Sequence, residues 1–99
     1  MICLLSLLWA CSDADIDIQE ERGIIQRNQQ FDLSSPCAFT ILIDNTEYSP
    51  TFLPTAFQTD GARVFMKVEF LTTEAICYPD RNTTINVPEI RIEQIRLEE

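Results

Sequence analysis

The clearest pattern along this chain is an alternation of apolar and charged side chains between Ala62 and Thr73. The apolar residues on one side are Val64, Met66, Val68 and Phe70, and the charged residues on the other are Arg63, Lys67 and Glu69. A period of two predicts a strand with one buried face. Phe65 and Leu71 interrupt the charged side, so we expect that side to be partly covered as well.

Shorter segments upstream predict a hairpin and a helical turn. Phe39–Asp44 is apolar and β-branched, Asp44-Asn45 is a turn signal, and Glu47–Ser49 returns as a second strand. Pro50 ends this hairpin, because proline has no N–H to donate. Leu53–Gln58 follows, with a proline at a favourable first helical position, and we expect one helical turn there.

The remaining segments are less regular. Residues 73–86 look like the start of a strand interrupted by a loop, and a first strand is expected from about Gly23 onward. In the closing run the alternation slips between Ile92 and Ile95, which a bulge at Glu93-Gln94 explains. An amphipathic helix is the alternative, but it would place Ile90 and Ile92 on different faces. Five or six short strands and one helical turn predict a mainly β fold, a small antiparallel barrel or curled sheet.

The N-terminal end has a different composition. Residues 1–10 are apolar and uncharged, whereas residues 11–21 carry five acids and no base. We interpret 1–10 as a cleaved signal peptide, 11–21 as a flexible acidic tether and 22–99 as the folded domain. The apolar run is shorter than the ~20 residues that span a bilayer. A buried N-terminal strand or helical turn is the alternative interpretation.

The junction Leu8-Trp9-Ala10-Cys11 resembles the lipobox of bacterial lipoproteins, although Trp9 is bulky and no basic residue precedes the apolar run. A start codon placed too far downstream would explain the missing basic residues. The resemblance implies lipid attachment at Cys11 and a membrane anchor. Ser12-Asp13-Ala14-Asp15 is similar to the surface-export signal of Bacteroidetes lipoproteins, which implies an outer-membrane lipoprotein facing the cell surface.

The lipoprotein interpretation leaves Cys37 and Cys77 in the mature domain, since Cys3 lies in the removed segment. In an exported protein two such cysteines are expected to form a disulfide, here closing a loop of about 40 residues. A reactive thiol pair or a metal site is the alternative. The chain has no Cys-x-x-Cys spacing, and zinc requires four ligands. Asp13-x-Asp15-x-Asp17 lacks the glycine and glutamate of a calcium loop. No metal or cofactor is therefore predicted.

A longer motif spans the centre of the chain, and it is Tyr48-x-Pro50-x-x-Leu53-Pro54-x-x-Phe57-x-x-Asp60-Gly61-x-x-Val64. It resembles a pattern in small bacterial lipoproteins, many from Bacteroidetes, that have an OB-like barrel. The resemblance covers about residues 37–97, and cysteines in those proteins flank the central hairpin region and the strand after it, as Cys37 and Cys77 do here. It implies an OB-like fold and an envelope location, and it carries no activity or catalytic residue.

Composition narrows the possible functions. The 99 residues include 16 acids, 7 bases and no histidine, which gives a net charge of −9. This charge disfavours nucleic acid as a partner, and the missing histidine removes the commonest general base. Two glycines cannot build a glycine-rich phosphate loop. We therefore expect a protein that is not an enzyme.

Two hypotheses for function remain. The first is a lipid-anchored, non-catalytic module of the cell envelope that binds a protein partner or a ligand. The second is an inhibitor of a secreted hydrolase, with the loop at residues 78–83 as its inserting element. Candidate contact residues in this loop are Tyr78, Asp80 and Arg81, with Arg81 at the tip. An ordinary surface connection is the alternative role for the loop.

Overall fold

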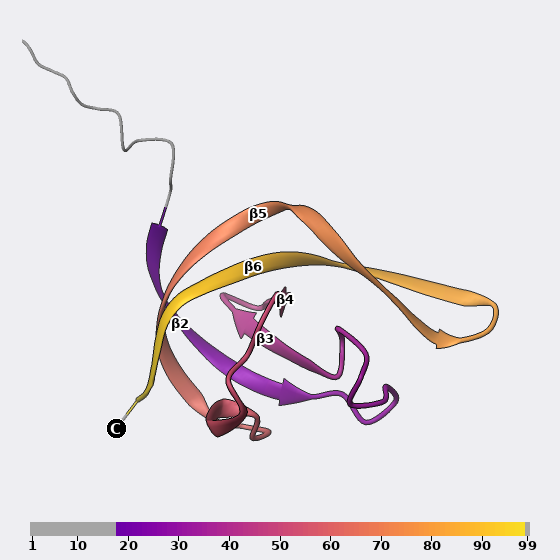
Figure 1. Cartoon of the computed structure of the whole chain (residues 1–99), viewed down its shortest axis with the longest axis horizontal. Helices are drawn as coiled ribbons and strands as arrows, with labels where there is room; N and C mark the ends of the chain where they lie inside the picture. Colours follow the sequence, from indigo (N-terminus) through magenta and orange to yellow (C-terminus); the bar gives the residue numbers. More distant parts are fainter. Residues whose placement is uncertain (1–17, 99) are drawn as a thin grey trace, which may run out of the picture.

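The computed structural model describes residues 18–98, and most of them lie in strands (Figure 1). The predicted signal peptide, Cys11 and the tether up to residue 17 lie outside the described residues. In chain order the elements are β2 (Ile18–Arg27), β3 (Phe39–Ile43), β4 (Thr46–Pro50), the 3-10 turn η2 (Thr55–Phe57), β5 (Arg63–Asp80) and β6 (Thr83–Leu97). The hairpin, the helical turn and the long central strand are therefore confirmed.

The strands close into a barrel in the order β2-β3-β4-β6-β5. Four pairings are antiparallel, as predicted, and the β4·β6 pairing is parallel, through Ser49 opposite Glu89 and Pro50 opposite Ile90. A closed ring with an odd number of strands cannot alternate direction throughout, so one parallel pair is unavoidable. This order, with a connection between β4 and β5 that carries η2, is the topology of an OB-like barrel and confirms the predicted fold.

The barrel core follows the alternation seen in the sequence. Val64, Met66 and Val68 of β5 are buried, and they pack with Ile25, Ile41, Ile43, Leu53 and Ile90. At the β3–β4 turn, Asp44 and Asn45 take positive φ values of 50° and 66°. Both residues tolerate this backbone conformation, which a two-residue hairpin turn of the I′ type requires.

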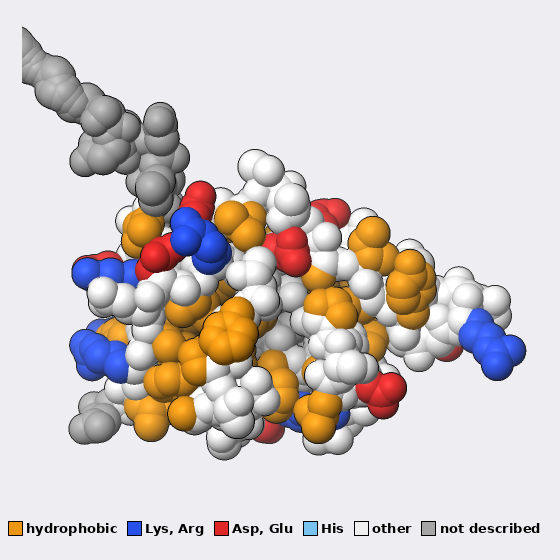
Figure 2. Space-filling model, in the orientation of Figure 1, with side chains coloured by type: hydrophobic (Ala, Val, Ile, Leu, Met, Phe, Trp, Pro, Cys, Tyr) orange, Lys and Arg blue, Asp and Glu red, His pale blue; other side chains and the backbone are white. Residues whose placement is uncertain are grey.

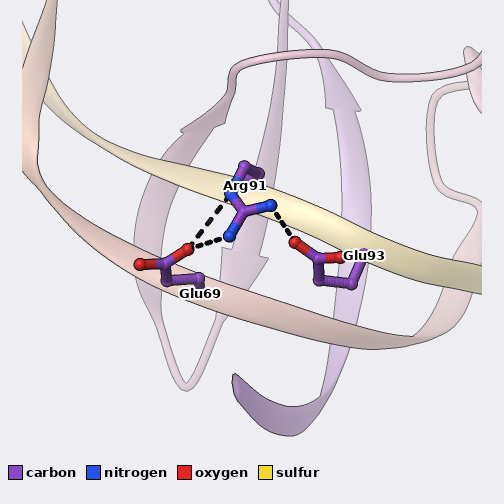
Figure 3. A network of polar contacts seen from close by, with 3 residues as sticks. All are labelled: Glu69, Arg91 and Glu93. Atoms are coloured by element: carbon purple, nitrogen blue, oxygen red, sulfur yellow. Dashed lines mark hydrogen bonds and ion pairs between the residues drawn. The ribbon is translucent and has the colours of Figure 1, made fainter. Parts of the chain in front are cut away.

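The predicted bulge in the closing strand is confirmed, and the helix alternative is wrong. Lys67 lies opposite Gln94 and Val68 opposite Ile92, so Glu93 is the extra residue. Glu93 and Arg91 share one face with Glu69 of β5, and Figure 3 shows Arg91 between the two carboxylates. Hydrogen bonding to Glu69 raises the pKa of Arg91 above its ordinary value.

Two boundaries differ from the prediction. β2 begins at Ile18, because β5 is long enough to pair its residues 66–69 with residues 18–21, which the sequence analysis placed in the tether. Backbone pairing does not require apolar side chains, so the acidic residues there did not signal a strand. The interruption expected between residues 73 and 86 is present but shorter than predicted. That segment is a hairpin whose strands meet at a turn formed by Arg81 and Asn82.

Candidate partner-binding arm

The outer half of the β5–β6 hairpin projects from the barrel as an arm, which we define as residues 74–88 (Figure 1). Its base is a bulge in β5: Phe70 lies opposite Ile90 and Glu74 opposite Pro88, so three residues of β5 span the space of one on β6. The Thr73 hydroxyl donates to the Glu89 carboxylate at 2.6 Å across this bulge. A bulge of this kind bends a strand and separates the arm from the barrel wall.

A second, smaller core holds the arm. Its buried residues are Phe31, Cys37, Ala75, Cys77 and Val87, with Ile85 packed against them. Cys37 and Cys77 form a disulfide, with Cα atoms 6.2 Å apart and a sequence separation of 40. The predicted disulfide therefore joins the 28–38 loop, which connects β2 to β3, to the middle of the arm.

The 28–38 loop is itself fixed by buried polar contacts. The Asn28 amide donates to the Cys37 carbonyl at 2.8 Å and to the Thr40 hydroxyl at 3.1 Å, and Thr40 donates to Glu47 at 2.6 Å. Thr40 is fully buried, so these bonds replace those that water would otherwise make. Since the disulfide ties the arm to an immobilised loop, the arm is braced against the barrel.

The outward face of the arm carries apolar side chains. Ile76 is 52% exposed and Tyr78 is 64% exposed, whereas Ala75 and Cys77, which alternate with them along β5, are buried. Figure 2 shows apolar side chains gathered along the projecting part of the molecule. Side chains on both faces of this part of β5 are therefore apolar, and those on one face are exposed to solvent. Exposed apolar side chains that lie together are typical of a surface that contacts another protein.

The predicted contact residues meet at the end of the arm, with different roles. The Asp80 carboxylate accepts a hydrogen bond from the Asn82 N–H at 2.8 Å and from the Thr83 hydroxyl at 3.3 Å. Asp80 therefore holds the turn, as aspartate does in an Asx turn. Tyr78 and Arg81 are exposed and available for contact. Sequence reasoning missed Ile76, whose signal was the alternation with Ala75 and Cys77.

The groups that could support chemistry do not converge in the described part of the chain. Ser49 is fully buried and its hydroxyl donates to the Pro36 carbonyl at 2.9 Å, so it is inaccessible as a nucleophile. Lys67 is exposed on the outer wall of the barrel. Within residues 18–98 no group of three or more histidine, cysteine, aspartate or glutamate side chains is placed to hold a metal ion.

One depression, of about 610 Å³, lies on the side of the barrel formed by β2, β5 and β6. Its lining includes Phe65. The guanidinium groups of Arg22 and Arg96 lie over the Phe65 ring, 4.9 Å and 4.5 Å from its centroid. Three carboxylates share this lining with three cations: Glu20, Glu21 and Asp44 beside Arg22, Lys67 and Arg96. The opposite charges balance, so the depression shows no preference for a charged ligand, and the arm is the stronger candidate site.

Comparisons with known protein families, with curated proteins and with solved structures gave no match. Within residues 18–98, no helix has the length and apolar character needed to cross a membrane.

Proposed function

We propose that this protein is a non-catalytic binding module of the cell envelope, anchored by a lipid on Cys11, that contacts a protein partner through its arm. The observation that carries the proposal is the exposure of Ile76 and Tyr78 on an arm braced by the Cys37–Cys77 disulfide. A braced arm loses little conformational entropy on binding, so more of the contact energy is retained as affinity.

The placement of the arm supports this proposal. Figure 1 shows the turn between β5 and β6 at the opposite end of the described fold from the start of β2. An anchor at Cys11 would therefore leave the arm pointing away from the membrane, toward partners in the surrounding compartment.

The lipid anchor is tested by metabolic labelling with a fatty-acid analogue. We expect the wild-type protein to be labelled and Cys11→Ala to remain unlabelled. Cys3→Ala serves as the matched control and should be labelled like the wild type, because the predicted cleavage removes that residue. Equal labelling of wild type and Cys11→Ala would contradict the anchor without bearing on the arm.

The binding surface is tested by photo-crosslinking in cells. A photoreactive amino acid at position 78 is expected to give one discrete adduct, and the same group at position 44, in the β3–β4 turn, should give none. Excess purified wild-type protein should suppress the adduct, whereas excess protein carrying Tyr78→Ser and Arg81→Ala should not. Adducts of equal yield at both positions would refute the arm as the contact surface.

A second candidate function is inhibition of a secreted hydrolase. It is favoured by one observation, which is that Arg81 stands exposed at the end of a narrow, disulfide-braced arm. If this hypothesis is correct, the adduct at position 78 contains a hydrolase, and the purified protein inhibits it. Arg81→Ala should then abolish inhibition, while Arg63→Ala, on the barrel wall, should retain it.

A further inference from the structure

We propose that the partner of the arm contributes an extended strand, which adds to the free edge of β5 at residues 74–78. This inference rests on the proposed function and specifies the partner's chemistry and the mode of contact.

The edge is open in the described part of the chain. β2 covers the outer edge of β5 only as far as the pair Ile18 and Glu69. Beyond Glu69 no strand formed by residues 18–98 lies on that side, and the backbone hydrogen bonds of the 28–38 loop are made within the loop and to neighbouring residues, not to β5. The unpaired N–H and C=O groups along such an edge are complementary to another extended chain.

The unpaired stretch of this β5 edge has a defined end on each side. The bulge between Phe70 and Glu74 closes it at the barrel side, and Pro79 closes it at the turn side. The five residues between contain neither proline nor lysine, the two residue types that most often protect an edge strand. On the other strand of the arm, Pro88 lacks a donor and Glu89 already pairs with β4. The edge of β6 at residues 83–87 also lacks proline, but the exposed side chains beside it, Thr84 and Asn86, are polar. Residues 74–78 are therefore the edge of the arm with exposed apolar neighbours, and they have the length of a typical strand.

The side chains beside this edge specify the partner's sequence pattern. Ile76 and Tyr78 alternate on the exposed face, so an added strand would place its own alternate side chains beside them. Neighbouring side chains across paired strands lie about 4.5–5.5 Å apart at Cβ, and apolar pairs stabilise the pairing. The arm has only two strands, and a third would extend its apolar face. We therefore expect a partner segment with apolar residues at every second position.

Charge favours a foreign segment over a second copy of this chain. Glu74 and Asp80 flank a stretch that has no charged residue, and the whole chain carries a net charge of −9. Two copies would repel each other, whereas a segment with lysine or arginine at its ends would be attracted. The occupant we infer is an apolar, strand-forming segment with basic ends.

The test uses a fluorescent eight-residue peptide in which valine alternates with threonine between terminal lysines. The binding partner is the full chain with its disulfide formed, and fluorescence anisotropy reports binding. We expect saturable binding, and amide hydrogen exchange at residues 74–78 should slow when the peptide is bound. Two methylated peptides are compared, one with methyl groups on the odd-numbered backbone nitrogens and one with methyl groups on the even-numbered nitrogens. In one of the two, the methyl groups replace the N–H donors that face β5, and binding of that peptide should weaken about tenfold or more. Glutamate in place of the terminal lysines should also weaken binding.

The protein variants provide matched controls. Ile76→Lys places a charge beside the edge and should abolish binding, while Ile18→Lys, on an exposed position of β2, should bind like the wild type. If neither methylated peptide binds more weakly than the unmodified peptide, or if exchange slows only in other strands, the inference is overturned. It is also overturned if sedimentation shows a dimer without peptide and the same protection at residues 74–78, because a second copy would then occupy the edge.

The outcomes separate this inference from the proposed function. Suppose that a partner crosslinks at position 78 but its binding does not depend on its backbone N–H groups. The arm is then still the contact surface, and strand addition is rejected. If the peptide slows amide exchange at residues 74–78 but no crosslinked adduct forms in cells, strand addition is supported as a property of the edge and the proposed function is rejected.

Discussion

Breaking the Cys37–Cys77 disulfide is expected to lower the free energy of unfolding by about 4 kcal/mol. The value follows from the sequence separation of 40 between the two cysteines, because a crosslink of that span removes about 13 cal/mol/K of entropy from the unfolded chain. A domain of this size has about 4–12 kcal/mol of stability in total. The disulfide therefore accounts for at least a third of it.

Urea denaturation of the oxidised and the reduced wild-type protein measures this difference without changing any other side chain. With a slope of about 1–1.5 kcal/mol per molar urea, the midpoint should fall by about 3 M on reduction. The urea midpoint of the double variant Cys37→Ala, Cys77→Ala should be lowered at least as much. This variant also leaves space in the second core, where both cysteines are 1% exposed.

The position of the disulfide predicts where stability is lost first. Reduction should accelerate amide hydrogen exchange in the arm, residues 74–88, and in the 28–38 loop, while the exchange of β3 changes only through global unfolding. Two results would refute this reasoning. A loss below about 1 kcal/mol would show that loop closure contributes little, and an equal acceleration in every strand would show that the disulfide does not hold the arm in particular.

Three further predictions concern the fold. Gly23→Ala should destabilise the domain by about 1–3 kcal/mol in urea denaturation, because an added Cβ would lie 2.5 Å from Cγ2 of Ile41; an unchanged midpoint would contradict this. Thr40→Val should lower the free energy of unfolding by about 1–3 kcal/mol, because it removes the buried hydroxyl that hydrogen-bonds both Asn28 and Glu47. Thr73→Val, which removes an exposed bond of the same 2.6 Å length, should change it far less; equal losses would rule out burial as the cause. Asp80→Ala should accelerate exchange of the amide two residues later, seen by NMR, and leave the midpoint nearly unchanged.

Local patterns in the sequence determined much of the barrel. The alternation at Val64, Met66 and Val68 defined the inner face of β5, because side chains of a strand alternate between its two sides. Asp44-Asn45 determined the first hairpin through the backbone conformations that these residues tolerate. The slip between Ile92 and Ile95 marked the bulge at Glu93. Each of these features depends on residues close together in the chain.

Tertiary structure alone decided the start of β2 and the existence of the arm. Residues 18–21 form a strand because β5 offers them an edge, and nothing in their own side chains requires it. Residues 74–88 read as a broken strand, since only contact with Phe31 and Cys37 shows that Ala75 and Cys77 have a buried face. The candidate site depends on the opposite face, where Ile76 and Tyr78 are left exposed. The order in which strands meet around the barrel is set by pairings between distant segments, and a local pattern carries no record of them.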